Sequence, residues 1–284
     1  MLERCLSALT AGAEPSELEV VVVCNGCTDD TASIARRFGD PVRVIESPIG
    51  SKINALNLGD RAATGFPRFY VDGDVVLNIH SVRAIAQRLQ TGDVLAAAPR
   101  IRHDFARCSW AVKAFYNIDR RMPSFQEGIG GSGVYALSET GRARFAEFPT
   151  LTADDGFVRL SFRPSERGAV EDAESVVTPP STLHGLIRIK TRSHFGSYEL
   201  RKNRPELFEN FGTGNRAAVA GLIRQPSLWP SLAVYGYVKA RAKLAARKKM
   251  KQGRYGIWER DQTSRLAGTI STNHNLATSN YQAV

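Results

Sequence analysis

Short apolar runs alternate with longer amphipathic segments over residues 18–98. The first run, 18–24, is rich in β-branched residues, and each run has Gly, Pro, Asn or Asp within three residues of its end, a pattern typical of buried strands. The segments between the runs contain no proline and are followed by glycine, as helices often are. The predicted strands are 18–24, 42–45, 68–71 and 94–98, and the predicted helices are 29–38, 52–63 and 79–90.

Strands that alternate with helices of this length predict an α/β fold, with a Rossmann-like, mainly parallel sheet and helices on both of its faces. In such sheets ligands bind beyond the carboxyl ends of the strands. Asn25 follows the first predicted strand and Asp72 follows the third. We therefore expect a binding site at the edge of the sheet that these two residues share.

The pattern is less regular in the rest of the chain. The glycine-rich segment Gly128–Gly133 leads into a short predicted strand at 134–137, and a further helix is predicted to begin within 150–155. Longer helices are predicted at 108–121, 183–201 and 230–251. These patterns divide the chain into an α/β domain at 1–204, a basic helical extension at 205–262 and a tail at 263–284, which is poor in apolar residues and is expected to be disordered.

Positive charge is concentrated in one segment near the end of the chain. The formal net charge is +10, and residues 239–254 contain eight Lys and Arg side chains and no carboxylate. The helix predicted at 230–251 is therefore basic and partly amphipathic. Three interpretations remain open: a solvated helix packed on the domain by one face, a helix on an anionic membrane surface, and a nucleic-acid-binding helix, of which the last is the one we least expect.

The overall composition is that of an ordinary globular protein, with 43% hydrophobic and 23% charged residues. No apolar run approaches the roughly 18 residues that a membrane-spanning helix needs, and the first residues lack the pattern of a secretory signal. We therefore expect a cytoplasmic protein that can bind peripherally to the inner face of the plasma membrane. The four cysteines are too few for a disulfide scaffold, and the pair Cys24-x-x-Cys27 lacks the second Cys or His pair of a zinc site.

Asp72-Gly73-Asp74 directly follows a predicted strand. Two carboxylates on one turn can bind a divalent cation, and the glycine between them allows a diphosphate to approach the backbone. The cation is required because carboxylates alone would repel a phosphate. The alternative is a polar turn without a ligand, since Asp-x-Asp also occurs by chance.

Five motifs occur in an order that resembles the family 2 glycosyltransferases of the GT-A fold. They are Val20–Thr31, Gly50–Gly59, Tyr70–Val75, Gly130–Gly133 and the pair Asp154-Asp155. The resemblance covers about residues 1–200 and implies that 1–204 is a GT-A domain. It also implies an inverting, Mg²⁺- or Mn²⁺-dependent enzyme that transfers a sugar such as a hexose from a UDP- or GDP-sugar. The acceptor would be a glycan or a lipid-linked saccharide, in cell-surface polysaccharide synthesis.

The resemblance assigns the donor site to residues of the first motifs. Asn25 would contact the nucleotide, because Cys24 stands where relatives carry an aspartate. Asp29 would be a second contact or would mainly cap the following helix. Lys52 belongs to a Lys-x-x-Ala-Leu-Asn-x-Gly block of the family and would reach the donor.

The resemblance places the metal and the chemistry on four carboxylates. Asp72 would meet the nucleotide sugar and, with Asp74, the metal that bridges its diphosphate. Asp155 matches the family's catalytic base, which accepts the proton of the acceptor hydroxyl as that oxygen attacks the anomeric carbon. Asp154 would be its catalytic partner, in the place where many relatives carry Glu.

The helix predicted at 183–201 places Arg188 and Arg192 on one face, with His184 one turn earlier. This arrangement is similar to the basic motif that follows the acidic pair in the family, although the Gln-x-x-Arg-Trp pattern of processive synthases is missing. The two arginines would then bind the donor and stabilise the leaving diphosphate. The alternative is a solvated basic helix, and we expect His184 to be packed or hydrogen-bonded rather than bound to a metal.

One departure concerns the start of the chain, which opens in the helix that should follow the family's first strand. It indicates a truncated reading frame, or a product without part of its nucleotide pocket. Two rival functions follow. A sugar nucleotidyltransferase should carry a Gly-rich loop with Arg or Lys near its start, and none is found. A non-catalytic module derived from a truncated transferase would bind a membrane or nucleic acid through the basic helix.

Overall fold

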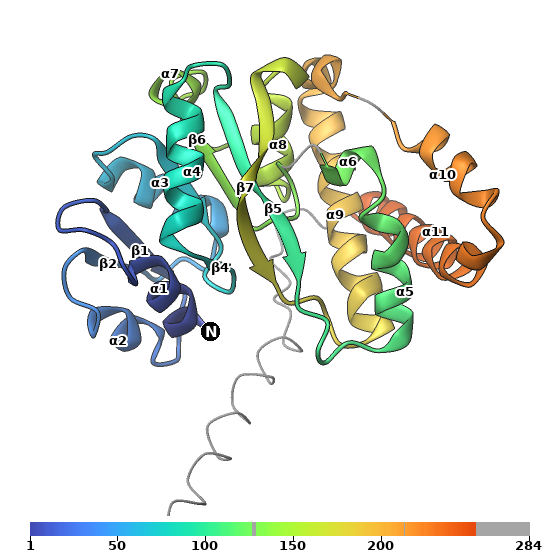
Figure 1. The fold of residues 1–284 in the computed structure, drawn as a ribbon, viewed down its shortest axis with the longest axis horizontal. Coiled ribbons are helices and arrows are strands. Elements are labelled where there is room, and N and C mark those ends of the chain that lie inside the picture. The colour runs from blue at the N-terminus through green and yellow to red at the C-terminus, as the bar shows by residue number, and fades with distance from the viewer. Residues whose placement is uncertain (127–128, 213, 254–284) are drawn as a thin grey trace, which may run out of the picture.

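The computed structural model describes residues 1–126, 129–212 and 214–253, which form sheets flanked by helices (Figure 1). The strands are β1 (Val20–Asn25), β2 (Val42–Ser47), β3 (Arg68–Val71), β4 (Val76–Leu77), β5 (Ala96–His103), β6 (Val134–Leu137) and β7 (Arg167–Val177). The α-helices are α1 (Leu2–Thr10), α2 (Thr31–Arg36), α3 (Lys52–Ala62), α4 (Ile79–Gln90), α5 (Trp110–Asp119), α6 (Pro123–Gln126), α7 (Glu139–Arg142), α8 (Asp154–Leu160), α9 (Leu183–Asn203), α10 (Arg216–Ile223) and α11 (Trp229–Lys251). Three short 3-10 helices are η1 (Pro164–Glu166), η2 (Pro205–Asn210) and η3 (Pro226–Leu228).

The described strands form two sheets. β1 and β2 pair in parallel, and the other five strands follow the order β3-β6-β5-β7-β4. In the larger sheet β5 and β7 are parallel, whereas β3 with β6, β5 with β6, and β4 with β7 are antiparallel. The α/β class is confirmed, but the sheet is mixed rather than mainly parallel. Only a turn separates β3 from β4, and β6 and β7 lie outside the regular alternation on which the parallel prediction rested.

Helices cover both faces of the larger sheet, as the sequence predicts. Ile85 of α4 shares one buried cluster with Ala97, and Phe157 of α8 shares another with Ala96 and Ala98. The three alanines are fully buried and alternate between the faces, as the pleat of a strand requires. Their small side chains let helices approach the sheet from both sides.

Every strand and helix predicted for residues 18–98 is present, with shifted ends. The long strand β7 was not predicted, because Glu171, Asp172 and Glu174 interrupt its apolar residues. These three side chains are exposed, while Ala173 and Ser175 between and beside them are buried. Among the described residues no strand precedes α1, and β1 does not pair with β3.

The helices α5, α9 and α11 pack together on the side of the larger sheet away from β1 and β2 (Figure 1). α11 confirms the helix predicted at 230–251, and it buries one face whose residues have helical spacing: Tyr235, Val238, Ala242 and Ala246. None of the described helices is long and apolar enough to cross a membrane. The tail predicted at 263–284 lies outside the described residues.

Candidate active site

The turn Asp72–Asp74 is held between β3 and the glycine-rich loop before β6. The Asp72 N–H donates to the carbonyl of Gly133 at 2.8 Å. Gly133 has φ +64°, and a Cβ there would lie 2.5 Å from Cγ2 of Val75, so only glycine fits. The glycine-rich loop therefore fixes the backbone that presents Asp72 and Asp74.

Lys52 joins this turn to the acidic pair at the start of α8. It is the first residue of α3, whose N-terminus is capped by the Ser51 side chain. The Lys52 Nζ lies 2.8 Å from Oδ1 of Asp72 and 3.0 Å from Oδ2 of Asp154. The structure thus brings together three predicted site residues from α3, the turn after β3 and α8.

Burial and charge act against each other in this cluster. Burial works to lower the pKa of Lys52, but the negative charges of Asp72 and Asp154 outweigh it and raise that pKa. Asp154 is only 5% exposed, and burial raises the pKa of its carboxyl despite the opposing charge of Lys52. The cluster carries more carboxylates than cations, so Lys52 is the group that makes their close approach tolerable.

Asp155 lies next to this cluster but has different partners. Its Oδ1 accepts from the N–H of Gly156 at 2.7 Å, and its Oδ2 accepts from the N–H of Gly131 at 3.3 Å. Its side chain remains partly accessible to solvent. Two backbone donors therefore orient a carboxylate that a substrate can still reach.

The helix α9 supports the start of α8 from behind. A Cβ at Gly196 would lie 2.8 Å from Cβ of Ala153, so the absence of a side chain at Gly196 allows the two helices to touch. The buried carboxylate of Glu199 accepts from the N–H of Thr152 at 2.7 Å. Both contacts act on the two residues that precede the acidic pair.

Asp74 and Arg192 complete the part of the site that the structure assembles. Desolvation by the surrounding protein and then the charge of Asp72 raise the pKa of Asp74, while the charge of Arg192 acts in the opposite direction. Arg192 is half-buried on α9. Its positive charge therefore acts on the Asp74 carboxyl.

The first 138 residues, from α1 to the end of β6, match the family model described as glycosyl transferase family 2. This part of the chain is a family 2 glycosyltransferase domain. The match contains Lys52, Asp72 and Asp74, while Asp154 and Asp155 follow it. No protein of curated function matches the sequence significantly.

Solved structures of other proteins are similar to this chain over most of its length. A mannosyltransferase from Pyrobaculum calidifontis, PcManGT in complex with GDP-Man and Mn²⁺, has 19% identity and a TM-score of 0.55 over 94% of this chain and 74% of its own. Glucosyl-3-phosphoglycerate synthase from Mycobacterium tuberculosis has 17% identity and a TM-score of 0.49, over 71% of this chain and 74% of its own. TarS from S. aureus in complex with UDP has 12% identity and a TM-score of 0.45, over 92% of both chains. The likeness to PcManGT supports the GT-A fold predicted from the motifs.

Other predicted residues of the transferase domain lie outside this cluster. Asn25 is at the end of β1, and the following Gly26 approaches the Gly50 backbone so closely that a Cβ would lie 2.8 Å from its Cα. This contact brings the β1 turn beside the loop that leads to Lys52. Asp29 accepts from the Thr31 N–H at 3.2 Å, so its carboxylate caps the start of α2.

Arg188 and His184 are exposed on α9, and no described contact joins either of them to the acidic cluster. Within residues 1–126, 129–212 and 214–253 no group of three or more His, Cys, Asp or Glu side chains is arranged to hold a metal. The thiols of Cys24 and Cys27 are free. The structure therefore gives the two cysteines no disulfide and no metal site.

The sequence did not single out three residues that lie close to the site. The Cys5 thiol of α1 approaches the Asp72 carbonyl at 4.0 Å, and burial followed by the charges of Asp74 and Asp72 raises its pKa to about 11. Burial, followed by the charge of Asp154, raises the pKa of Tyr135 well above its usual range. Glu199 is the third. Only Tyr135 carried a signal in its position, since it is the second residue of the strand predicted after the glycine-rich loop.

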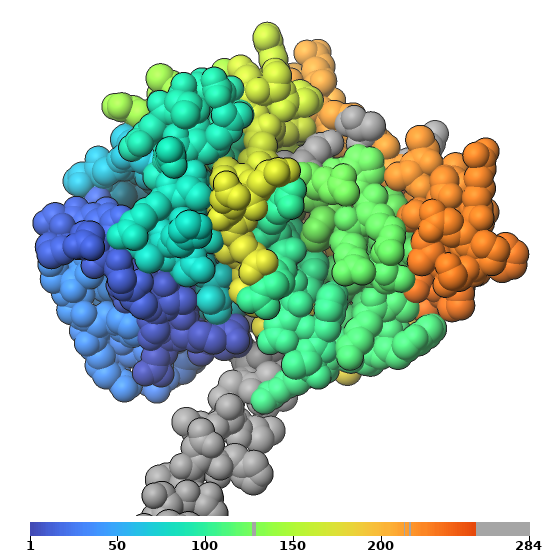
Figure 2. All heavy atoms as spheres, viewed as in Figure 1, coloured from blue at the N-terminus to red at the C-terminus, as the bar shows by residue number. Residues whose placement is uncertain are grey.

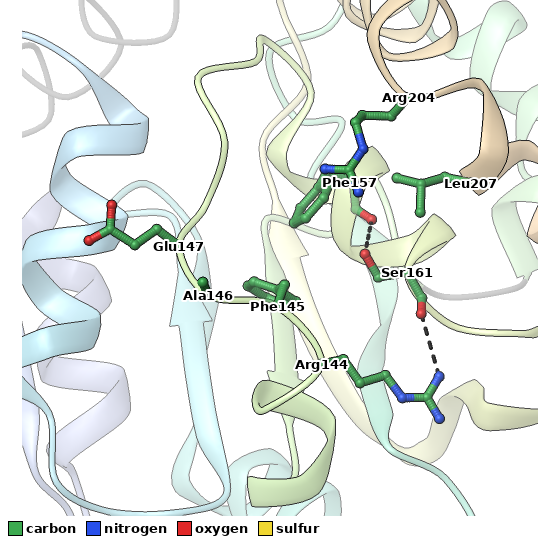
Figure 3. A pocket seen from close by; sticks show the side chains of 8 residues that line it. All are labelled: Arg144, Phe145, Ala146, Glu147, Phe157, Ser161, Arg204 and Leu207. Carbon is green, nitrogen blue, oxygen red and sulfur yellow. Dashed lines mark hydrogen bonds between the residues drawn. The ribbon is translucent and has the colours of Figure 1, made fainter.

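A separate pocket of about 450 Å³ lies between α8, η2 and the segment after α7 (Figure 3). None of the predicted site residues lines it. Two arginines on its wall are already paired, Arg144 with Glu166 and Arg204 with Glu206. Its lining residues are Arg144, Phe145, Ala146, Glu147, Phe157, Ser161, Arg204 and Leu207.

Proposed function

We propose that this chain transfers a sugar from a UDP- or GDP-sugar to a hydroxyl of a saccharide acceptor, with inversion at the anomeric carbon. The observation that carries this proposal is the position of Lys52 between Asp72 and Asp154. Lys52 joins the turn Asp72–Asp74, which the resemblance assigns to donor binding, to the pair Asp154-Asp155, which the resemblance assigns to catalysis. The two halves of the proposed chemistry are therefore adjacent.

The donor lies along the carboxyl ends of β1 and β3. Asn25 contacts the nucleotide, and the close approach of Gly26 to Gly50 aligns that turn with Lys52. Asp29 acts mainly as a helix cap, in keeping with its bond to Thr31. PcManGT binds GDP-Man in a similar fold, which supports a nucleotide-sugar donor here.

The residues at the turn after β3 fit a divalent cation, Mg²⁺ or Mn²⁺. Asp72 and Asp74 supply carboxylate oxygens, the ligand type that these ions prefer. Desolvation and then the charge of Asp72 raise the pKa of Asp74, and a cation would offset both effects. The presence of Mn²⁺ in PcManGT supports this fit. Bound there, the cation would neutralise the diphosphate of the donor.

Asp155 is the general base of the transfer. It accepts the proton of the acceptor hydroxyl as the hydroxyl oxygen forms a bond to the anomeric carbon. The bond from that carbon to the diphosphate oxygen breaks, and its electron pair leaves with the nucleoside diphosphate. The N–H groups of Gly131 and Gly156 hold the carboxylate in one orientation for this step.

Asp154 and the arginines have supporting roles. Asp154 is buried against Lys52. It acts as the partner of Asp155, because it positions both the Asp155 backbone and the Lys52 side chain. Arg192 stabilises the charge of the leaving diphosphate, since its positive charge already acts on Asp74. Arg188 lies one turn earlier on α9 and reaches the donor only if its exposed side chain turns toward the site.

The acceptor is a glycan or a lipid-linked saccharide of cell-surface polysaccharide synthesis. The test of the whole proposal is release of nucleoside diphosphate from a panel of UDP- and GDP-sugars by the purified chain, with Mn²⁺, with Mg²⁺ or with a chelator. We expect turnover of at least one donor, with the metal required. Failure to bind or turn over any member of the panel in either metal would overturn the proposal.

A further inference from the structure

The face of α11 opposite its buried seam is exposed. Ala233, Tyr237, Ala240 and Leu244 follow helical spacing along it and are all accessible to solvent. Figure 2 shows the C-terminal helical region, in orange, forming one edge of the molecule. α11 therefore carries a second apolar stripe, which no described part of the chain covers.

The large side chains of this edge are unusually accessible. Tyr237 is 52% exposed and Leu244 is 60% exposed. Trp229, at the start of α11, is 58% exposed, and its indole N–H donates to the carbonyl of Ile223, which is itself 56% exposed. Tryptophan and tyrosine rings are typical of the zone where a protein meets a lipid headgroup layer.

Cations surround the apolar stripe. No Asp or Glu occurs from residue 210 to residue 258, a span with ten Lys and Arg residues. On α11 the exposed cations with no ion pair to a described carboxylate are Arg241, Lys243, Arg247, Lys248 and Lys251. We call these five cations together with Ile223, Trp229, Tyr237 and Leu244 the basic apolar face.

We propose that the basic apolar face binds the surface of an anionic lipid bilayer. Lipid fits both halves of the pattern, because the apolar side chains enter the headgroup boundary while Lys and Arg attract the anionic headgroups. Nucleic acid fits the cations but gives no reason for an exposed leucine and isoleucine beside them. The partner is therefore a membrane surface rather than a polyanion in solution.

The position of α9 gives this surface a consequence for the site. Leu186 of α9 shares a buried cluster with Val238 of α11, and further along α9 Gly196 and Glu199 contact residues 152–153 at the start of α8. One rigid helix thus connects the membrane-binding face to the proposed catalytic pair. A protein bound through α11 holds its site at a fixed distance from the bilayer.

The experiment is sedimentation of the full chain with vesicles of phosphatidylcholine alone or with about 30% phosphatidylserine. We expect binding to the anionic vesicles only, weakening as the salt concentration rises and the Debye length shortens. R241Q/R247Q/K248Q/K251Q should bind about 10²-fold more weakly or worse, since each cation contributes severalfold. Y237S/L244S keeps every charge and should bind about 10-fold more weakly, because the lost contact is apolar.

The matched control is R36Q/R37Q/R61Q/R88Q, which removes the same charge from exposed positions on or beside α2, α3 and α4. It should bind anionic vesicles like the parent. The proposal is overturned if the parent does not sediment with anionic vesicles or if the control loses binding as strongly as the α11 variant. It is also overturned if Y237S/L244S binds like the parent, or if the protein binds single-stranded or duplex DNA and ignores vesicles.

Discussion

The ammonium of Lys52, at the start of α3, lies 3.0 Å from the carboxylate of Asp154, at the start of α8. The two residues are far apart in sequence and meet only because the sheet places both helices at one edge. Asp154 is buried, so Lys52 is the cation that compensates a charge withdrawn from water. Several consequences of this ion pair can be measured.

Lys52→Met should leave Asp154 buried beside Asp72 and Asp155 without a cation. We expect a loss of about 2 kcal/mol in the free energy of unfolding at neutral pH, discounted because Lys52 is partly exposed. K52M/D154N should recover part of that loss, since the uncompensated carboxylate is gone. Chemical denaturation of the parent, both single variants and the double variant gives the coupling, and strictly additive effects would contradict the pairing.

The same variant should change the pH dependence of stability. Removing Lys52 raises the pKa of Asp154 further above its unfolded value, so the folded state holds a proton that the unfolded state releases. The contribution of Asp154 to stability is then greatest at low pH and falls as the pH rises through the folded pKa. K52M should therefore lose more stability than the parent between about pH 5 and pH 8. An equal loss of stability over this pH range in K52M and in the parent would show that Lys52 does not affect the pKa of Asp154.

Asp74→Asn tests the cation at the turn after β3. The variant should fold, lose turnover of the donor and bind nucleoside diphosphate with the same affinity with and without Mn²⁺. Asp172→Asn, at an exposed position on β7, is the matched control and should behave like the parent. Isothermal titration in metal and in chelator measures the difference. Turnover by D74N near the parent rate would mean that Asp74 does not hold the cation.

Gly196→Ala tests the support of the catalytic pair by α9. The new Cβ would meet Ala153 at 2.8 Å, so α8 must shift and Asp155 with it. We expect destabilisation by about 1–3 kcal/mol and a fall in the transfer rate of about 10-fold or more, with donor affinity changed much less. Gly236→Ala on α11 meets nothing within 4 Å and should instead stabilise the protein by about 0.5–1 kcal/mol without affecting transfer. Identical behaviour of the two variants would refute a positioning role.

His194 should make the helical side of the molecule sensitive to acid. Burial, and then the charges of Lys239, Lys243 and Lys190, lower its pKa to about 4. Because this value lies below that of the unfolded chain, its contribution is present above about pH 6.5 and is lost as the pH falls toward 4. His194→Phe should reduce the loss of stability between pH 7 and pH 5 by about 1–2 kcal/mol.

Exposed His184 provides the matched control for this measurement. His184→Gln replaces an exposed imidazole on the same helix and controls for the loss of a histidine as such. Thermal unfolding of the three proteins at both pH values is sufficient. If H194F and H184Q show the parent's acid sensitivity alike, another group is responsible.

The alternating half of the fold was predictable because each of its strands is an apolar run bounded by turn residues. β7 was not, because its outward side chains are charged and its inward ones are small, so its apolar pattern is weak. Mixed pairing was also hidden from the sequence. Strand direction depends on how the connecting helices and loops return the chain to the sheet, which a local pattern of apolar residues does not determine.

The candidate site, like the fold, was predictable from the sequence only in part. Asp72 and Asp74 could be singled out from residue type and position after a strand, and the acidic pair from its place in the order of motifs that resembles the family. Lys52 was predicted as a donor contact, but nothing in the sequence indicated that it would bridge two carboxylates. Glu199 and Gly196 could not be found, because they act through residues 152–153. Contacts between residues distant in sequence depend on packing that a local pattern does not contain.

The central claim is that Asp155 is the base of a sugar transfer, and one comparison tests it most directly. Asp155→Asn and the parent are assayed for transfer to an acceptor and, separately, for donor affinity. We predict a transfer rate lower by about 10²- to 10⁴-fold with nearly unchanged donor affinity, the range for losing a general base. A variant that transfers at the parent rate, or that loses donor affinity as much as rate, would contradict the account.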